Sequence, residues 1–129
     1  MTNTFPPPLF AITLFTDDLA LSIDFYTRFL GVNPVFGDDV SSVFKVGETL
    51  INLLQNAAVP ELIDPAPMAP AGARAVYSLY VPDISAHAER LRAAGLALLN
   101  GPMDRPWGIR TLSVSDPSGH IWELAQRLG

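Results

Sequence analysis

The chain has 129 residues, enough for one domain with a buried core and too few for two independent domains. Apolar residues make up 49% of the sequence and charged residues 16%, a balance that excludes a disordered chain. A formal net charge of -5 with a single lysine, Lys45, argues against nucleic-acid binding, and the absence of cysteine excludes disulfides, thiolate metal sites and a cysteine nucleophile.

No apolar run approaches the roughly 18 residues that a membrane-spanning helix needs. The N-terminal stretch "MTNTFPPPLF" lacks the basic start of a signal peptide. We therefore expect no membrane partner and a cytoplasmic location.

The first half of the chain begins with the stretch "LFAITLFT", which predicts a strand over residues 9–16. A helix follows, capped by Asp17 or Asp18 and ended by Gly31. Next come a faint strand in "NPVFG" and two short strands, "SSVFKVG" and "TLINLLQN", joined as a hairpin around Gly47 and Glu48. The apolar face predicted for the helix comprises Leu19, Ile23, Tyr26 and Leu30.

The second half repeats this order. "AVYSLYVP" predicts a strand, and a helix runs from its cap Asp83 to its stop Gly95, burying Ile84, Ala88 and Leu91. The strands "LALLN", "IRTLSVS" and "HIWELAQ" follow, and "DPSG" joins the last two as a type I turn.

The stretch between the halves, "AAVPELIDPAPMAPAGA", contains four prolines, which argue against a helix or a central strand and favour a stiff extended connection. We therefore expect a single domain, 1–129, in the α+β class. It consists of a first βαβββ module at about 9–57, a Pro-rich linker at about 58–73 and a second βαβββ module at about 74–127.

Two stretches, "DLALSIDFYTRFLG" near the start and "PWGIRTLSVSDPSGHIWEL" near the end, give the sequence a resemblance to the vicinal oxygen chelate superfamily. This superfamily includes glyoxalase I, extradiol dioxygenases, fosfomycin resistance enzymes and bleomycin-binding resistance proteins. The resemblance extends from about Leu9 to Gln126. It implies paired βαβββ modules whose mixed sheet curls into a cup, usually within a homodimer.

In the enzymes that the chain resembles, a divalent metal in the cup is held by up to four side chains, one on the first strand and one on a late strand of each module. Counting back from the helix caps places the first-strand positions at Ala11, or Ile12 if the register slips, and at Tyr77. The late strands offer Asn52 and Glu123. Since only Glu123 is a typical metal ligand, we expect no metal and no cofactor.

Because strand residues alternate between faces, Tyr77 and Glu123 are expected to line the cup together with apolar neighbours. Trp107, in "RPWGIR", either covers the ligand or forms a structural corner, and Arg110 either contacts the ligand or pairs with an acid such as Asp116. His87 is interpreted as a surface residue and His120 as part of the turn, and no residue is assigned a catalytic role. The candidate ligand-binding residues are Phe15, Asn52, Leu54, Tyr77, Leu79, Trp107, Arg110 and Glu123.

The favoured hypothesis is a metal-independent protein that sequesters an apolar or aromatic small molecule such as an antibiotic, as the bleomycin-type members do. The alternative is an enzyme of the same family, a glyoxalase-like lyase or isomerase or an extradiol-type dioxygenase. Such an enzyme would be metal-dependent, or metal-free with Glu123 as general base and Tyr77 as proton donor. A third hypothesis is a dimerisation or regulatory module whose cup is filled by its own side chains.

Overall fold

The computed structural model describes residues 6–129, and its strands form two sheets of four. Residues 1–5 of the N-terminal stretch considered above lie outside the described residues. The first sheet has the order β1-β4-β3-β2, with β1 parallel to β4 and the other pairs antiparallel. Its strands are β1 (Ala11–Thr16), β2 (Phe36–Gly37), β3 (Ser41–Val46) and β4 (Thr49–Gln55).

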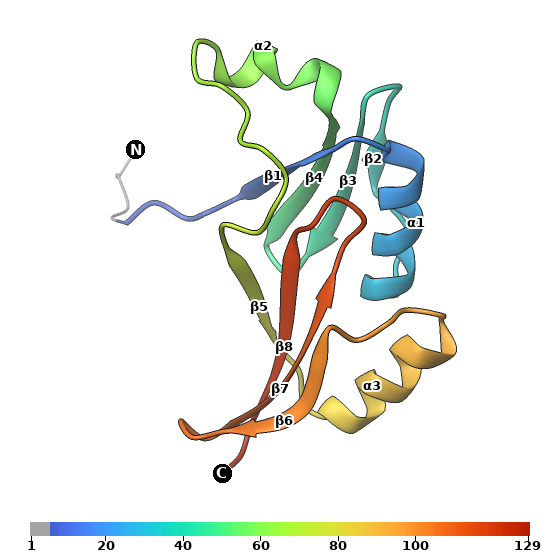
Figure 1. Cartoon of the computed structure of the whole chain (residues 1–129), viewed down its shortest axis with the longest axis vertical. Helices are drawn as coiled ribbons and strands as arrows, with labels where there is room; N and C mark the ends of the chain where they lie inside the picture. Colours follow the sequence, from blue (N-terminus) through green and yellow to red (C-terminus); the bar gives the residue numbers. More distant parts are fainter. Residues whose placement is uncertain (1–5) are drawn as a thin grey trace.

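The second sheet repeats this topology as β5-β8-β7-β6, again with one parallel pair, β5 with β8. The α+β class is therefore confirmed, and the strands form two mixed sheets that do not close into a barrel (Figure 1). The strands of this sheet are β5 (Val76–Tyr80), β6 (Asn100–Arg105), β7 (Ile109–Ser115) and β8 (Ile121–Arg127).

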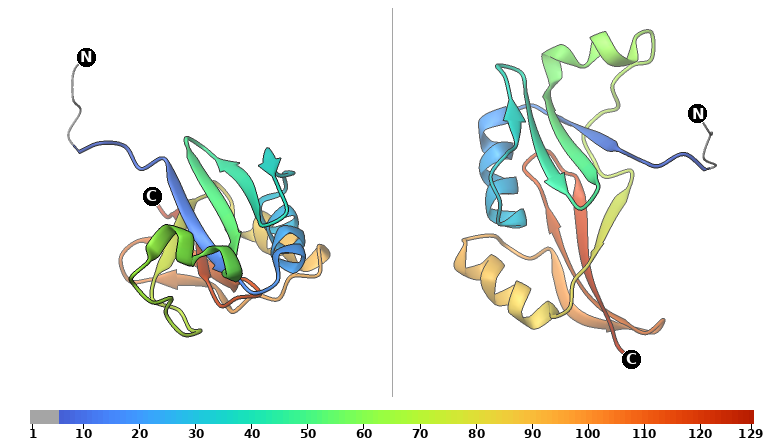
Figure 2. Two further views of the ribbon diagram at one scale, coloured as in Figure 1. Left: turned by 90° about the horizontal axis from the view of Figure 1, so that it is seen from above. Right: turned by 180° about the vertical axis from the view of Figure 1, so that it is seen from behind.

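Two helices, α1 (Leu19–Leu30) and α3 (Ile84–Ala93), lie on the same side of the molecule (Figures 1 and 2). Aspartate caps start both helices, because the carboxylate of Asp18 accepts from the backbone N–H of Leu21 and that of Asp83 from Ala86. The structure thus selects Asp18 over Asp17 as the first cap. Within residues 6–129, neither helix is long and apolar enough to cross a membrane.

The predicted apolar face of α1 packs against the core, but the buried face is wider than predicted. Tyr26 is buried, Leu19, Ile23 and Leu30 are partly buried against the core, and Phe25 and Phe29, which were not predicted, are buried as well. The reason is that this aromatic face packs against both sheets, against Phe44 of β3 and Trp122 of β8. One hydrophobic cluster therefore spans both halves, which supports our proposal of a single domain.

One predicted strand and the predicted linker need correction. Residues 96–99 of "LALLN" are not a strand, since the backbone N–H of Leu96 caps α3 by bonding the carbonyl of Leu91, and β6 begins only at Asn100. The Pro-rich connection contains helices at its start, the 3₁₀ turn η1 (Asn56–Ala58) and α2 (Pro60–Ile63). Pro60 stands at the first position of α2, where its missing N–H removes no helical bond.

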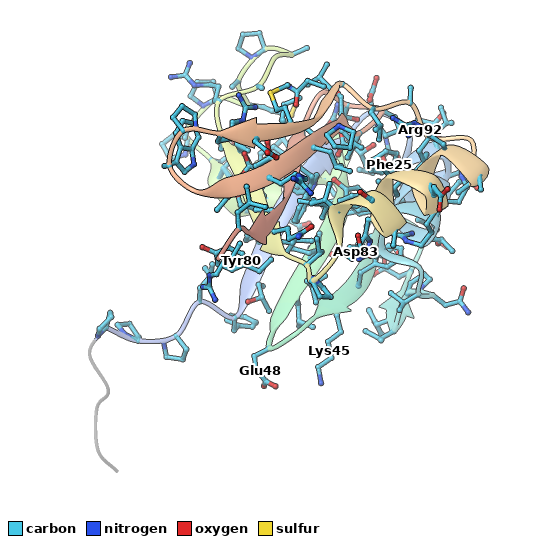
Figure 3. The ribbon with its side chains drawn as sticks, turned by 90° about the horizontal axis from the view of Figure 1, so that it is seen from below. Phe25, Lys45, Glu48, Tyr80, Asp83 and Arg92 are labelled. Atoms are coloured by element: carbon cyan, nitrogen blue, oxygen red, sulfur yellow. The ribbon has the colours of Figure 1, made fainter. Side chains whose placement is uncertain are left out.

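The predicted hairpin is confirmed. The strands β3 and β4 are joined by Gly47 and Glu48, with Val46 paired to Thr49 and Gly47 in the left-handed region. Lys45 and Glu48 point away from the body of the protein at this end of the sheet (Figure 3).

Candidate functional site

Each sheet turns one face toward the helical core and the other away from it, and we call the second the distal face. On the first sheet the pairing of Thr13 with Asn52 places Phe15, Asn52 and Leu54 on the distal face, as predicted from alternation. The amide of Asn52 donates to the hydroxyl of Thr13 at 3.4 Å. Its buried carbonyl oxygen has no hydrogen-bond partner among the described residues.

The prediction that Tyr77 and Glu123 share a face is wrong. Tyr77 pairs with Trp122 and packs against its ring at 5.1 Å between centroids, on the core side of the second sheet. Leu79 also packs against the core. Glu123 instead pairs with Ser78 on the distal face and accepts from its hydroxyl at 2.9 Å. Ser78 is therefore the hydrogen-bond partner of Glu123.

Trp107 and Arg110 lie away from these residues. Trp107 is 66% exposed in the connection between β6 and β7, with the guanidinium of Arg105 over its ring at 5.9 Å. Arg110 forms an ion pair, but its partner is Asp104 at 2.6 Å and not Asp116. The eight candidate residues therefore fall into separate groups, and their role in ligand binding stays a prediction.

The four strands on which the resemblance places metal ligands, β1, β4, β5 and β8, offer a donor set unsuited to a divalent metal. Seven residues before the caps Asp18 and Asp83 stand Ala11 and Val76, at equivalent positions of the two sheets. Neither has a lone pair to donate. Among the described residues there is no group of three or more His, Cys, Asp or Glu side chains that could hold a metal. The complete distal-face set on these strands is Ala11, Thr13, Phe15, Leu50, Asn52, Leu54, Val76, Ser78, Tyr80, Ile121, Glu123, Ala125 and Arg127.

A cavity of about 640 Å3 lies between the 64–75 segment, the end of β1 and the turn before β8. Phe15 and Tyr77 are the two candidate residues that line it, and the remaining walls combine Met68, prolines and alanines with a few polar groups. Its volume falls in the range of small-molecule binding pockets. The cavity was not predicted, because the 64–75 segment carries no periodic signal that shows where it folds back.

Beside this cavity lies a chain of hydrogen bonds that begins in the core. The indole N–H of Trp122 donates to the hydroxyl of Tyr26 at 2.8 Å, and that hydroxyl donates to Oδ2 of Asp116 at 2.6 Å. The same carboxylate oxygen lies 2.8 Å from Nδ1 of His120, which lines the cavity. The chain thus connects the buried indole to an imidazole at the cavity wall.

Asp116 is the centre of this chain. Its Oδ1 accepts from the backbone N–H groups of Ser118 and His120, at 2.9 Å each, which confirms the predicted turn role of His120. Burial raises the pKa of Asp116, but the hydrogen bonds from His120 and Tyr26 outweigh it and hold the pKa below its ordinary value. Burial and the Asp116 carboxylate raise the pKa of the Tyr26 hydroxyl, so it stays a donor. The spacing of Asp116 and His120 across "DPSG" was the available sequence signal.

Replacement of Tyr77 by alanine is expected to lower the free energy of unfolding by about 2 kcal/mol, because its half-buried ring packs against Trp122. Urea unfolding at neutral pH measures the change. Tyr80→Ala is the matched control, since that ring is 66% exposed, and it should change stability much less. Equal losses from the two variants would contradict the core position of Tyr77.

Comparison with known proteins agrees with this fold. A high-resolution crystal structure of a glyoxalase-related enzyme from Fulvimarina pelagi is 28% identical, with a TM-score of 0.82 over 93% of this chain and 88% of that one. A glyoxalase/bleomycin resistance protein/dioxygenase from Nocardioides is 25% identical, with a TM-score of 0.83 over 98% of this chain and 87% of that one. An uncharacterized protein of Mycobacterium bovis is 30% identical over 92% of this chain and 83% of its own length.

The model of the Glyoxalase/Bleomycin resistance protein/Dioxygenase superfamily matches residues 9–124, nearly the whole described chain. Together with the two mixed sheets of equal topology, this match shows that the chain belongs to that superfamily.

Proposed function

We propose that the protein binds a small apolar or aromatic molecule without a metal, and that it acts by sequestering this molecule. The observation that carries the proposal is the cavity of about 640 Å3, whose walls are mainly apolar and include the rings of Phe15 and Tyr77. Aromatic walls favour flat ligands, and the few polar groups can fix their orientation. An antibiotic is one ligand of this kind.

The donor set on the distal faces supports metal independence. In the enzymes that the chain resembles, the metal polarises the substrate oxygens, which requires several strong ligands. Glu123 is the one carboxylate on the distal faces of β1, β4, β5 and β8, and it is bonded to Ser78. Under this proposal the protein carries out no metal-dependent step.

The metal-free enzyme alternative finds less support. It required Glu123 as base and Tyr77 as proton donor to act on one substrate, yet these side chains lie on opposite faces of the second sheet. A ligand cannot contact both groups from one face. Binding without turnover agrees both with the donor set on the distal faces and with the position of Glu123 and Tyr77 on opposite faces of the second sheet.

We further propose that the protein is a cytoplasmic homodimer. The second sheet exposes apolar side chains on its distal face, including Val76 at 57% and Tyr80 at 66% exposure. Covering such side chains with a second copy would remove apolar area from water. Sedimentation equilibrium tests this part of the proposal, and a monomer at micromolar concentration would contradict it.

Chelation is expected to leave the melting temperature unchanged within about 1 °C, because removing a metal destabilises only a protein that binds one. The measurement compares thermal unfolding before and after dialysis against EDTA, with elemental analysis of protein expressed in medium supplied with zinc, nickel, manganese and iron. A fall of several degrees, or close to one metal per subunit, would contradict the proposed metal independence.

A further inference from the structure

We propose that the cavity binds an aromatic or apolar acid that also carries a hydroxyl or N–H group, with Arg74 holding the carboxylate and His120 accepting the hydrogen bond. This inference rests on the proposed function, since it names the ligand class of the same cavity.

The state of His120 follows from its contact with Asp116. Because the carboxylate of Asp116 is ionised at neutral pH and already accepts from Tyr26, the atom it faces on His120, Nδ1, must carry the proton. In the neutral form of the ring, a proton on Nδ1 leaves a bare lone pair on Nε2. None of the described residues forms a hydrogen bond with Nε2 of His120. The ring side chain is 25% exposed, and His120 lines the cavity.

The turn side of the cavity is therefore rich in hydrogen-bond acceptors. Besides Nε2 of His120 it contains the carboxylate of Asp17, which the hydroxyl of Ser118 holds at 2.8 Å. A ligand carboxylate would be repelled by Asp17 at this end, whereas a hydroxyl or an N–H group can donate to either acceptor. The ligand must present a donor here.

The wall contributed by the 64–75 segment has the opposite character. Arg74 is the cationic side chain on this wall, and it has no ion-pair or hydrogen-bond partner among the described residues. A guanidinium binds a carboxylate through two parallel N–H groups. The lining also includes the apolar side chains of Phe15, Met68 and Tyr77, which suit an aromatic body.

The probe is 6-hydroxy-2-naphthoate, a flat apolar body that carries both a hydroxyl and a carboxylate. Isothermal titration calorimetry at pH 7.5 compares it with 2-naphthoate, which lacks the hydroxyl, and with 2-naphthol, which lacks the carboxylate. We expect loss of the hydroxyl to weaken binding about fivefold and loss of the carboxylate about tenfold.

Two variants test which residue causes each of these binding preferences. His120→Asn should abolish the preference for the hydroxyl and leave the preference for the carboxylate, and Arg74→Gln should do the reverse. Arg110→Gln is the matched control, because that arginine is paired with Asp104 and does not line the cavity. Circular dichroism confirms that each variant is folded. A nitrogen-15 NMR spectrum of the imidazole should place the His120 proton on Nδ1, and a proton on Nε2 at pH 7.5 would overturn the proposal.

The outcomes separate the two proposals. If the three naphthalene compounds bind equally well, or if both cavity variants keep the preferences of the parent protein, the ligand class is wrong and the proposed function stands. If none of the three compounds binds at 5 mM, both the ligand class and the proposed function are contradicted.

Discussion

Replacing Asp116 with asparagine is expected to lower the free energy of unfolding by about 2 to 4 kcal/mol at pH 7. The carboxylate accepts four hydrogen bonds, from Tyr26, from His120 and from two backbone N–H groups, and its side chain is 2% exposed. Asparagine keeps one acceptor oxygen for the backbone groups. Its amide nitrogen then faces the Tyr26 hydroxyl and the Nδ1 proton of His120, so buried donors lose their acceptor.

The same substitution should change how stability depends on pH. Hydrogen bonds hold the pKa of Asp116 in the folded protein below its ordinary value, against the effect of burial, so the unfolded chain takes up a proton first as the pH falls. The contribution of the carboxylate is complete above its unfolded pKa of about 3.9 and is lost as the pH falls through the lower folded pKa. The difference in the free energy of unfolding between the parent protein and Asp116→Asn should therefore become smaller below about pH 4.

Urea unfolding at pH 7, 4 and 3 measures both effects, with Asp104→Asn as the control. Asp104 is also paired, with Arg110, but the pair lies on the surface and its loss should leave the free energy of unfolding nearly unchanged at pH 7. A stability difference for Asp116→Asn that stays constant from pH 7 to pH 3 would show that the carboxylate is not ionised in the folded protein.

The elements predicted most accurately are those specified by a few neighbouring residues. The helix caps, the Gly47 and Glu48 hairpin and the turn after Asp116 each depend on side chains within about four positions, and the structure contains all of them. Their chemistry is local, so the sequence displays it directly.

The orientation of β5 could not be predicted in the same way. In "VYSLY" both faces of the strand carry apolar or aromatic side chains, so no alternation of polar and apolar residues decides which face meets the core. An error of one residue in counting from the cap Asp83 then moved Tyr77 to the wrong face. The contact that decides the face, between Tyr77 and Trp122, joins residues 45 positions apart.

The cavity depends on contacts of still longer range. It forms where the 64–75 segment returns past Phe15 of β1 and Asn56 to the turn that carries His120, so its walls come from four separate parts of the chain. The local pattern assigns proline and alanine to a connection and histidine to a turn, and both interpretations are correct. What no local pattern contains is that the connection and the turn face one another.

Gly101→Ala is expected to destabilise the protein by at least about 3 kcal/mol, which corresponds to a fall in melting temperature of about 10 °C or more. Gly101 lies in β6 where the pairing with β7 shifts register, and its φ of +84° favours glycine. An added Cβ would stand 2.4 Å from the carbonyl oxygen of Thr111 and 2.8 Å from Cα of Leu112. Both are backbone atoms of a central strand, which cannot move without breaking its pairing with β8.

Gly108→Ala separates the clash from the cost of the backbone conformation. Gly108 has nearly the same φ, +87°, but an added Cβ would meet no atom within 4 Å. This variant should therefore lose only the strain of a left-handed alanine, about 1 kcal/mol. Differential scanning calorimetry of the parent protein and both variants measures the difference. Equal melting temperatures for the two variants would show that β6 can shift away from β7, and would contradict the tight packing of these strands that the structure describes.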